Sequence, residues 1–202
     1  MFDSRLRRLI DPPLDAAGRW LAARGIGADQ MSLAGGAVGL AAAAAIACGA
    51  FGWGLVLIAA NRAADGLDGA IARATTPTDR GGFLDISLDF VFYAAVPLAF
   101  AAHDPARNAL AAAFLLASFL ANGSAFLAYA TLAAKRGLAS TAQGVKSIAY
   151  LAGLAEGAET IAAFCAMAFW PDAFAWIAGA FAIVCVASAA ARLMMGWRTF
   201  GP

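Results

Sequence analysis

Four aspartates lie close together in two segments whose other residues are mostly apolar. Together with their neighbours they follow the spacing Asp65-x2-Asp68-Gly69-x2-Ala72-Arg73-x7-Gly81-x3-Asp85-x3-Asp89. One charged side chain deep in a bilayer costs roughly 2.5–3.5 kcal/mol on insertion scales, so four carboxylates would cost on the order of 10 kcal/mol. A cation is needed to offset this charge, and a divalent metal ion is the simplest candidate.

The spacing also predicts how the four carboxylates meet. In a helix, Asp65 and Asp68 share one face, and Asp85 and Asp89 share a face of the next helix. The connection between the two helices is short, so we expect them to be antiparallel neighbours with facing acidic sides. Carboxylates without nearby His or Cys favour Mg²⁺ or Mn²⁺ over zinc.

Three further residues of the same stretch are suited to a phosphorylated substrate. Gly69 and Gly81 have no side chains, so a bulky polar group can lie against the backbone beside the acids. Arg73 offers a planar fork that can bind phosphate through two hydrogen bonds. Acids for metal, glycines for close approach and arginine for phosphate together indicate metal-assisted chemistry on a nucleoside diphosphate.

The composition predicts the elements that position these residues. Of the 202 residues, 62% are hydrophobic and 13% are charged, whereas soluble domains carry about 25% charged residues. We therefore expect an all-α polytopic membrane protein in which residues 29–202 form one transmembrane catalytic domain. Six spans are predicted, at residues 31–50, 53–72, 83–102, 109–134, 147–170 and 174–194.

The distribution of basic residues predicts the orientation of the spans. Arginines and lysines lie before the first span, after the second and fourth spans, and near the C-terminus, whereas Arg107 alone lies in the opposite loops. The positive-inside rule then places both termini and the acidic cluster on the cytoplasmic side of the cytoplasmic (inner) membrane. The net charge of +1 gives no indication of a nucleic-acid partner.

Residues 1–28 are expected to form a cytoplasmic juxtamembrane segment. Asp11 is suited to cap a helix, Pro12 to its first turn, and an apolar stripe begins at Leu14. We interpret residues 11–24 as a helix on the membrane surface, with an ordinary solvated lead-in as the alternative. Small residues in the spans fit a tight bundle and are equally compatible with a homodimer.

The aspartate constellation resembles the signature of the CDP-alcohol phosphotransferase family, also called CDP-alcohol phosphatidyltransferases. That signature is D-x2-D-G-x2-A-R-x7/8-G-x3-D-x3-D, and every fixed position is present between Asp65 and Asp89. Six spans after a surface helix are also similar to that family. One departure is visible, since members often carry Pro-Asn before the first span and this chain has Ala28, Asp29 and Gln30.

The resemblance implies an enzyme of phospholipid biosynthesis with defined residue roles. It implies transfer of a phosphatidyl group from CDP-diacylglycerol to a small alcohol, with release of CMP. The four aspartates would hold Mg²⁺ or Mn²⁺, and Asp89 would also be the general base for the acceptor hydroxyl. By the same resemblance, the residues that contact the CDP-lipid would be Asp68, Gly69, Arg73 and Gly81.

The acceptor is less well indicated by the sequence. Four basic residues at the cytoplasmic ends of later spans suit an acceptor with its own phosphate, such as glycerol 3-phosphate or an inositol phosphate. They are Lys135, Arg136, Lys146 and Arg192. The alternative is that they anchor lipid headgroups, as cytoplasmic basic residues do.

A pair of acids in the fifth span leaves other acceptors open. Glu156 and Glu159 share one helix face and suit a cationic alcohol such as choline or ethanolamine; serine also stays open. We favour a pairing of these acids with Arg62, because an intramembrane charge usually has a partner.

A divalent-cation transporter is the alternative from another functional class. The acidic cluster would then be the transit site for the ion. Such a carrier needs polar groups that lead to the external side, and beyond His103, Asp104 and Asp172 few are present. It would also have no use for glycine and arginine in this register.

Overall fold

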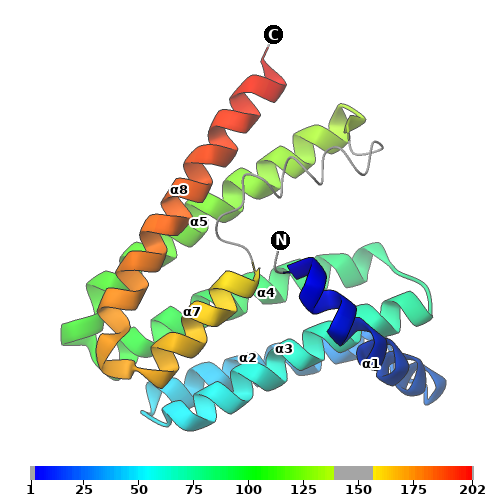
Figure 1. The fold of residues 1–202 in the computed structure, drawn as a ribbon, viewed down its shortest axis with the longest axis horizontal. Helices are drawn as coiled ribbons and strands as arrows, with labels where there is room; N and C mark the ends of the chain where they lie inside the picture. Colours follow the sequence, from blue (N-terminus) through cyan, green and yellow to red (C-terminus); the bar gives the residue numbers. More distant parts are fainter. Residues whose placement is uncertain (1–2, 139–156, 202) are drawn as a thin grey trace. The chain divides into compact units, whose positions relative to one another are not determined.

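The computed structural model describes residues 3–138 and 157–201 and is all-helical, as the sequence predicts (Figure 1). Its internal contacts divide the chain into two units, Met1–His103 and Asp104–Pro202. The first unit contains the helices α1 (Asp3–Ala23), α2 (Ala28–Ala47), α3 (Phe51–Ala74) and α4 (Asp79–His103). The second contains α5 (Pro105–Lys135), α7 (Gly157–Phe169), the 3-10 turn η2 (Pro171–Ala173) and α8 (Phe174–Phe200).

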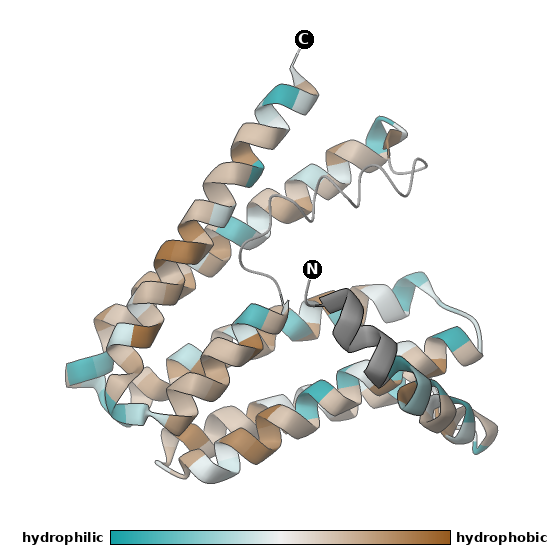
Figure 2. Cartoon of the chain, in the orientation of Figure 1, coloured by the Kyte–Doolittle hydropathy of each residue, from teal (hydrophilic) through white to brown (hydrophobic). Residues whose placement is uncertain are grey.

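Apolar residues predominate in the long helices that follow α1 (Figure 2). By length and composition, four described segments could cross a membrane: Ala28–Ala47, Asp79–His103, Pro105–Lys135 and Pro171–Phe200. Helix α3 is long enough, but Arg62, Asp65 and Asp68 interrupt its apolar stretch. Helix α7 is described only from Gly157 onward, and residues 147–156 of the fifth predicted span lie outside the described residues. The count of six spans therefore stays a prediction.

Helix α1 begins earlier than the sequence predicts. It starts at Asp3, so Asp11 lies inside the helix and the expected N-cap is wrong. Leu and Arg are good helix formers, and the stretch before Asp11 contains several of them, so the helix extends toward the N-terminus. Pro12 and Pro13 then lie within α1, where they lack the backbone N–H that a helix interior uses.

One face of α1 packs against the C-terminal half of α3. A Cβ built on Gly18 would lie 2.7 Å from Ala70 Cβ, and one built on Gly66 would lie 2.9 Å from Leu14 Cδ1. The two glycines therefore allow the helices to approach closely. Leu14, which the sequence assigned to a membrane-facing stripe, contacts α3 instead.

This contact predicts a strong effect of a single methyl group. We expect Gly18→Ala to destabilise the first unit by about 1–3 kcal/mol, because neither backbone has room to move aside. The matched control is Gly52→Ala, where an added Cβ meets nothing within 4 Å, and it should change stability by about 0.5 kcal/mol or less. Thermal unfolding of the purified variants in detergent measures both, and equal unfolding midpoints would contradict the tight α1–α3 contact.

Helix α4 also begins earlier than expected. The sequence predicts a loop through residue 82, but Thr78 Oγ1 accepts a hydrogen bond from the N–H of Gly81 at 3.0 Å and so caps the helix. Asp79 follows in the first turn, where its negative charge interacts favourably with the helix dipole. Gly81 therefore lies in the first turn of α4, one turn before Asp85.

The second unit is built on α5 and α8, which pack along each other. Phe119 of α5 makes edge-on ring contacts with Phe164 of α7 and Phe181 of α8, with centroids 6.2 and 6.0 Å apart. In the first turn of α5, Arg107 Nη1 donates a hydrogen bond to Asp172 Oδ1 in η2 at 3.2 Å.

Candidate active site

Helix α2 forms the floor on which α3 and α4 position the acidic side chains. Both helices pack against α2, whereas the sequence predicted mainly a direct contact between α3 and α4. A Cβ built on Gly35 would lie 3.0 Å from Ala64 of α3, and one built on Gly36 would lie 3.0 Å from Leu88 of α4. Small residues in α2 therefore set the spacing of the two acidic faces.

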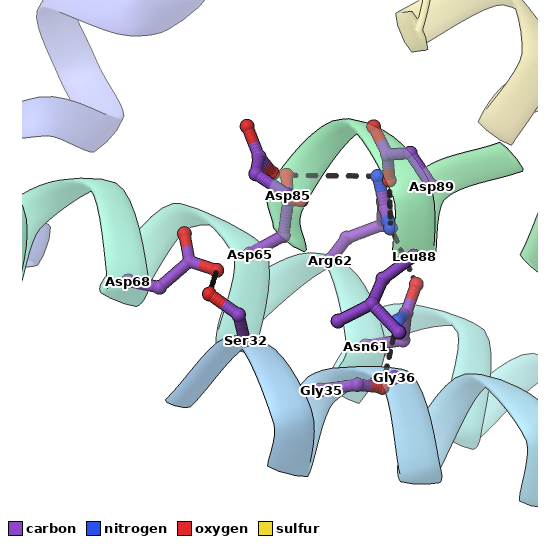
Figure 3. A pocket seen from close by; sticks show the side chains of 10 residues that line it. All are labelled: Ser32, Gly35, Gly36, Asn61, Arg62, Asp65, Asp68, Asp85, Leu88 and Asp89. Atoms are coloured by element: carbon purple, nitrogen blue, oxygen red, sulfur yellow. Dashed lines mark hydrogen bonds and ion pairs between the residues drawn. The ribbon is translucent and has the colours of Figure 1, made fainter. Parts of the chain in front are cut away.

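Three of the four aspartates come together above this floor (Figure 3). Asp65 of α3 and Asp85 and Asp89 of α4 each offer a carboxylate oxygen, and these oxygens lie within 4.8 Å of one another. Oxygens that share one Mg²⁺ at about 2.1 Å lie roughly 3–4 Å apart, so small rotations would suffice to bind one ion. The donor set, all hard oxygen, fits Mg²⁺ or Mn²⁺.

The fourth aspartate lies to one side of this group. Asp68 Oδ2 accepts a hydrogen bond of 2.6 Å from Ser32 Oγ of α2, and its residue is 7% exposed (Figure 3). The helical register places Asp68 one turn beyond Asp65, but Ser32 draws its carboxylate toward α2. Asp68 lines both the space between the aspartates and the larger cavity that is described below.

Arg62 already supplies a cation to the aspartate group. Its Nη2 lies 2.9 Å from Asp89 Oδ1 and its Nη1 lies 3.5 Å from Asp65 Oδ2. The sequence favoured a pairing of Arg62 with Glu156 or Glu159, and that pairing stays a prediction. Glu156 lies outside the described residues, and Glu159 belongs to the second unit. Of the two partners that the structure describes for Arg62, Asp89 of α4 is nearer than Asp65 of α3.

A cavity of about 550 Å³ opens beside the aspartate group. Its wall comes from the α1–α2 connection, the start of α2, the end of α3 and the start of α4. Ser32, Asp68 and Asp85 line both this cavity and the aspartate group. Gly69 and Gly81, the two glycines of the sequence pattern, are part of the same wall.

An ion pair between α2 and α4 forms one rim of the large cavity. Arg80 Nε donates to Asp29 Oδ2 at 2.7 Å. A Cβ built on Gly81 would lie 3.3 Å from Asp29 Oδ1, so the glycine leaves room for this carboxylate. Asp29 is one of the residues at which this chain departs from the Pro-Asn pattern, and the structure shows that it holds Arg80.

Arg73 lies at the C-terminal end of α3 and pairs with α1. Its Nη2 lies 2.8 Å from Asp15 Oδ1, and the two side chains are 55% and 37% exposed. Such an exposed pair contributes about 0–1 kcal/mol, so a phosphate can compete with Asp15 for the guanidinium. A Cβ built on Gly69 would lie 3.3 Å from Arg73 Nη1, which places the arginine next to the cavity wall.

Three of the four predicted acceptor residues are described, and they belong to the second unit. Arg136 Nη2 donates to the carbonyl oxygen of Phe200 at 3.1 Å, which satisfies a free carbonyl at the end of α8. The guanidinium of Arg192 lies 5.0 Å from the ring centroid of Phe126. Lys135 ends α5, and Lys146 lies outside the described residues.

With this geometry in place, comparison with known proteins identifies the family. Residues 26–188 match the CDP-alcohol phosphatidyltransferase family, and the match includes every residue of the aspartate group and both α2 and α4. The chain belongs to this family. It is accordingly a membrane protein of the CDP-alcohol phosphatidyltransferase family, as the aspartate signature indicates.

Two known proteins are similar in sequence to this chain. The chain is 45% identical over 199 residues to the inner membrane protein YnjF of Escherichia coli K12, covering 98% of this chain and 97% of that protein. It is 42% identical over 85 residues to the archaetidylinositol phosphate synthase of Methanothermobacter thermautotrophicus, covering 42% and 40% of the two chains.

One solved structure has the same fold as this chain. It is the phosphatidylinositol phosphate synthase of Mycobacterium tuberculosis, solved with CDP-DAG bound. The TM-score is 0.69 at 21% identity, and the alignment covers 91% of this chain and 93% of that one.

Several residues around the CDP-alcohol phosphatidyltransferase signature were not predicted to take part in the site. Ser32 and Asn61 are polar residues inside apolar helices, which was the only sequence signal for them. Asp15 and Asp29 gave no signal, because nothing in their local sequence reveals which arginine each one contacts. The signature residues themselves were all recognisable from their spacing.

Proposed function

We propose that this protein transfers a phosphatidyl group from CDP-diacylglycerol to a small alcohol, releases CMP and depends on Mg²⁺ or Mn²⁺. The observation that carries the proposal is the meeting of three carboxylates at the edge of a cavity of about 550 Å³. The chain's membership of the CDP-alcohol phosphatidyltransferase family supplies the reaction class.

The proposed roles follow from the position of each side chain. Asp65, Asp68, Asp85 and Asp89 would hold the metal, which when bound would neutralise charge on the pyrophosphate and on the leaving CMP. Gly69 and Gly81 leave space for the cytidine diphosphate, and Arg73 would bind phosphate. Asp68 lines both the space among the aspartates and the large cavity, so it would contact the donor as well as the metal.

Asp89 is the proposed general base. The acceptor oxygen forms a bond to the phosphorus that carries the diacylglycerol, the bond to the bridging oxygen breaks, and CMP leaves with that oxygen. Asp89 takes the proton of the acceptor hydroxyl in the same step. Its Oδ2 faces only Tyr93 Oη, at 3.4 Å among the described contacts, so one oxygen retains room for a proton.

For the acceptor we favour a phosphorylated alcohol, an inositol phosphate or glycerol 3-phosphate. Two of the similar proteins are named for inositol phosphate products. The proposed acceptor-binding residues, Lys135, Arg136, Lys146 and Arg192, would supply positive charge for the acceptor's own phosphate. Choline, ethanolamine and serine are the competing acceptors.

We also propose that the site faces the cytoplasm of the inner membrane, and that the protein can form a homodimer. The orientation follows from the basic residues at the predicted cytoplasmic ends of the helices. The location agrees with the similar protein from Escherichia coli, which is named an inner membrane protein. Small residues on the helix surfaces are suited to close contact between two copies.

The decisive experiment is CMP release by the purified full chain in detergent with CDP-diacylglycerol and Mg²⁺ or Mn²⁺. The acceptor panel contains an inositol phosphate, glycerol 3-phosphate, inositol, serine, choline and ethanolamine. Metal-dependent CMP release with a phosphorylated acceptor supports the whole proposal. Release only with choline, ethanolamine or serine would overturn the acceptor, and no binding of CDP-diacylglycerol would overturn the transferase.

A transferase is preferred over a divalent-cation transporter for two reasons. The family match covers residues 26–188, which includes the aspartate group and the wall of the large cavity except Gly25. The cavity also lies beside the aspartates and contains the signature glycines, which an ion path would not need.

Replacing Arg73 tests the proposed phosphate contact. We expect Arg73→Ala to weaken CDP-diacylglycerol binding by about 10–100-fold, because a hydrogen bond to a charged group contributes about 1.5–3 kcal/mol. The comparison variant is Asp15→Asn, which frees the guanidinium and should not weaken donor binding. Titration with the donor measures both, and an equal loss in Asp15→Asn would mean that Arg73 acts by holding α1.

A further inference from the structure

An ion pair at the rim of the large cavity has no part in the proposed metal chemistry. Arg80 Nε donates to Asp29 Oδ2 at 2.7 Å, and Arg80 Nη2 contacts the same oxygen. Both residues line the cavity of about 550 Å³ whose wall also contains Asp68 and Asp85. The pair and two of the proposed metal ligands therefore border one space.

The helices place this pair beyond the acids along the cavity wall. Asp29 precedes Ser32, the partner of Asp68, by three residues of α2. Arg80 precedes Asp85 by five residues of α4. At 1.5 Å per residue these separations are about 4.5 and 7.5 Å, which is similar to the length of a ribose. If the acids and their metal hold the diphosphate, as the proposed function requires, the base of the donor reaches the pair.

We propose that Asp29 reads the base of the donor and selects cytosine over uracil, and that Arg80 holds Asp29 in place. An ionised carboxylate accepts hydrogen bonds and donates none. Cytosine carries an amine that donates, whereas the corresponding group of uracil is a carbonyl oxygen that only accepts. Asp29 is therefore matched to cytosine and opposed to uracil. Arg80 is a positioning residue in this arrangement.

One oxygen of Asp29 is open to such a contact. Arg80 uses Oδ2, whereas Oδ1 accepts no hydrogen bond among the contacts of the described residues. A Cβ built on Gly81 would lie 3.3 Å from Oδ1, so the glycine leaves space beside this oxygen. The side chain of Asp29 is only 24% exposed. A base that enters this space can donate to Oδ1 without displacing Arg80.

The neighbouring structure keeps the pair in position. Asp29 lies in the first turn of α2 and Arg80 in the first turn of α4, which Thr78 caps. Asp29 is also one of the residues at which this chain departs from the Pro-Asn pattern. The amide of an asparagine has both a donor and an acceptor, and it can present either one to a base. A carboxylate held by a guanidinium presents acceptors alone.

The test compares the binding of CMP and UMP to the purified full chain in detergent with Mg²⁺, by isothermal titration calorimetry. The wild type should bind CMP about 10–150-fold more tightly than UMP, the range of one hydrogen bond to a charged group. In Asp29→Ala the two affinities should become nearly equal. The matched control is Asp79→Ala, which removes an acid that lines neither cavity and should keep the preference for CMP.

The ratio of the two affinities reports on the base alone, because damage to the fold would weaken both nucleotides alike. Arg80→Met should lower this ratio, since it releases the carboxylate of Asp29. A third nucleotide tests the amine itself. N4,N4-dimethyl-CMP keeps the cytosine ring but has no amine hydrogen, and it should bind the wild type much more weakly than CMP does.

Equal affinities of the wild type for CMP and UMP would overturn the inference. A preference for CMP that is retained in Asp29→Ala would also overturn it. In both cases CMP release from CDP-diacylglycerol would proceed, so the proposed function would stand. Failure of the proposed function is different, because CMP release would be absent with every acceptor. If neither nucleotide binds, the inference falls together with the transferase.

Discussion

Replacing Asp89 by asparagine is expected to lower kcat for CMP release by about 10²–10⁴-fold, the contribution of a general base. Asparagine has the same shape and keeps an oxygen that can accept the hydrogen bond from Arg62 Nη2, now 2.9 Å long. It cannot take a proton from the acceptor hydroxyl. The rate of CMP release at saturating donor and acceptor measures the effect, and donor binding should be largely retained.

The control for this variant is Asp172→Asn. Asp172 lies in η2 of the second unit and its side chain is 92% exposed, so the rate should stay unchanged. Full activity in Asp89→Asn would exclude Asp89 as the base. Lost activity together with lost donor binding would instead mean that Asp89 acts in building the site.

Removal of divalent metal is expected to abolish CMP release, and added Mg²⁺ or Mn²⁺ should restore it. Among the clustered acids, Asp85 tests the ligand role most directly, because it is exposed and none of the described ion pairs holds it. We expect Asp85→Asn to raise the Mn²⁺ concentration for half-maximal activity by at least about tenfold, since changes even in the outer shell of a metal site reach this size.

The matched control for Asp85 is Asp79→Asn on the same helix. Asp79 lies in the first turn of α4 and does not line either cavity, so its replacement should leave the metal dependence unchanged. CMP release by protein shown to be free of metal would contradict the proposed cofactor. An unchanged metal requirement in Asp85→Asn would remove Asp85 from the ligand set.

The signature residues were predictable because their information is local in the sequence. The spacing of Asp65, Asp85 and Asp89 alone places the acids on two facing helices and indicates metal chemistry. The family follows from the same stretch, and its match over residues 26–188 confirms it. The all-α fold was predictable from the composition, because apolar stretches of this length in a bilayer have few alternatives to the helix.

The partners of the charged residues were not predictable in the same way. Arg62 was visible as a charge inside a span, but a sequence shows no distances, and its ion pairs with Asp65 and Asp89 were not predicted. Asp15 with Arg73 and Asp29 with Arg80 join residues that are 58 and 51 positions apart. Such pairs depend on how helices pack, and not on local propensity.

The sequence by itself therefore determined the helical class, the aspartate signature and the family. Only the tertiary structure decided that α2 is the floor of the site, that Ser32 turns Asp68 aside and that Arg62 occupies one edge of the aspartate group. The physical reason is that charge and hydrophobicity are properties of single residues and short windows. The position of a guanidinium depends on contacts from several helices, here α2, α3 and α4, which form only when the chain is folded.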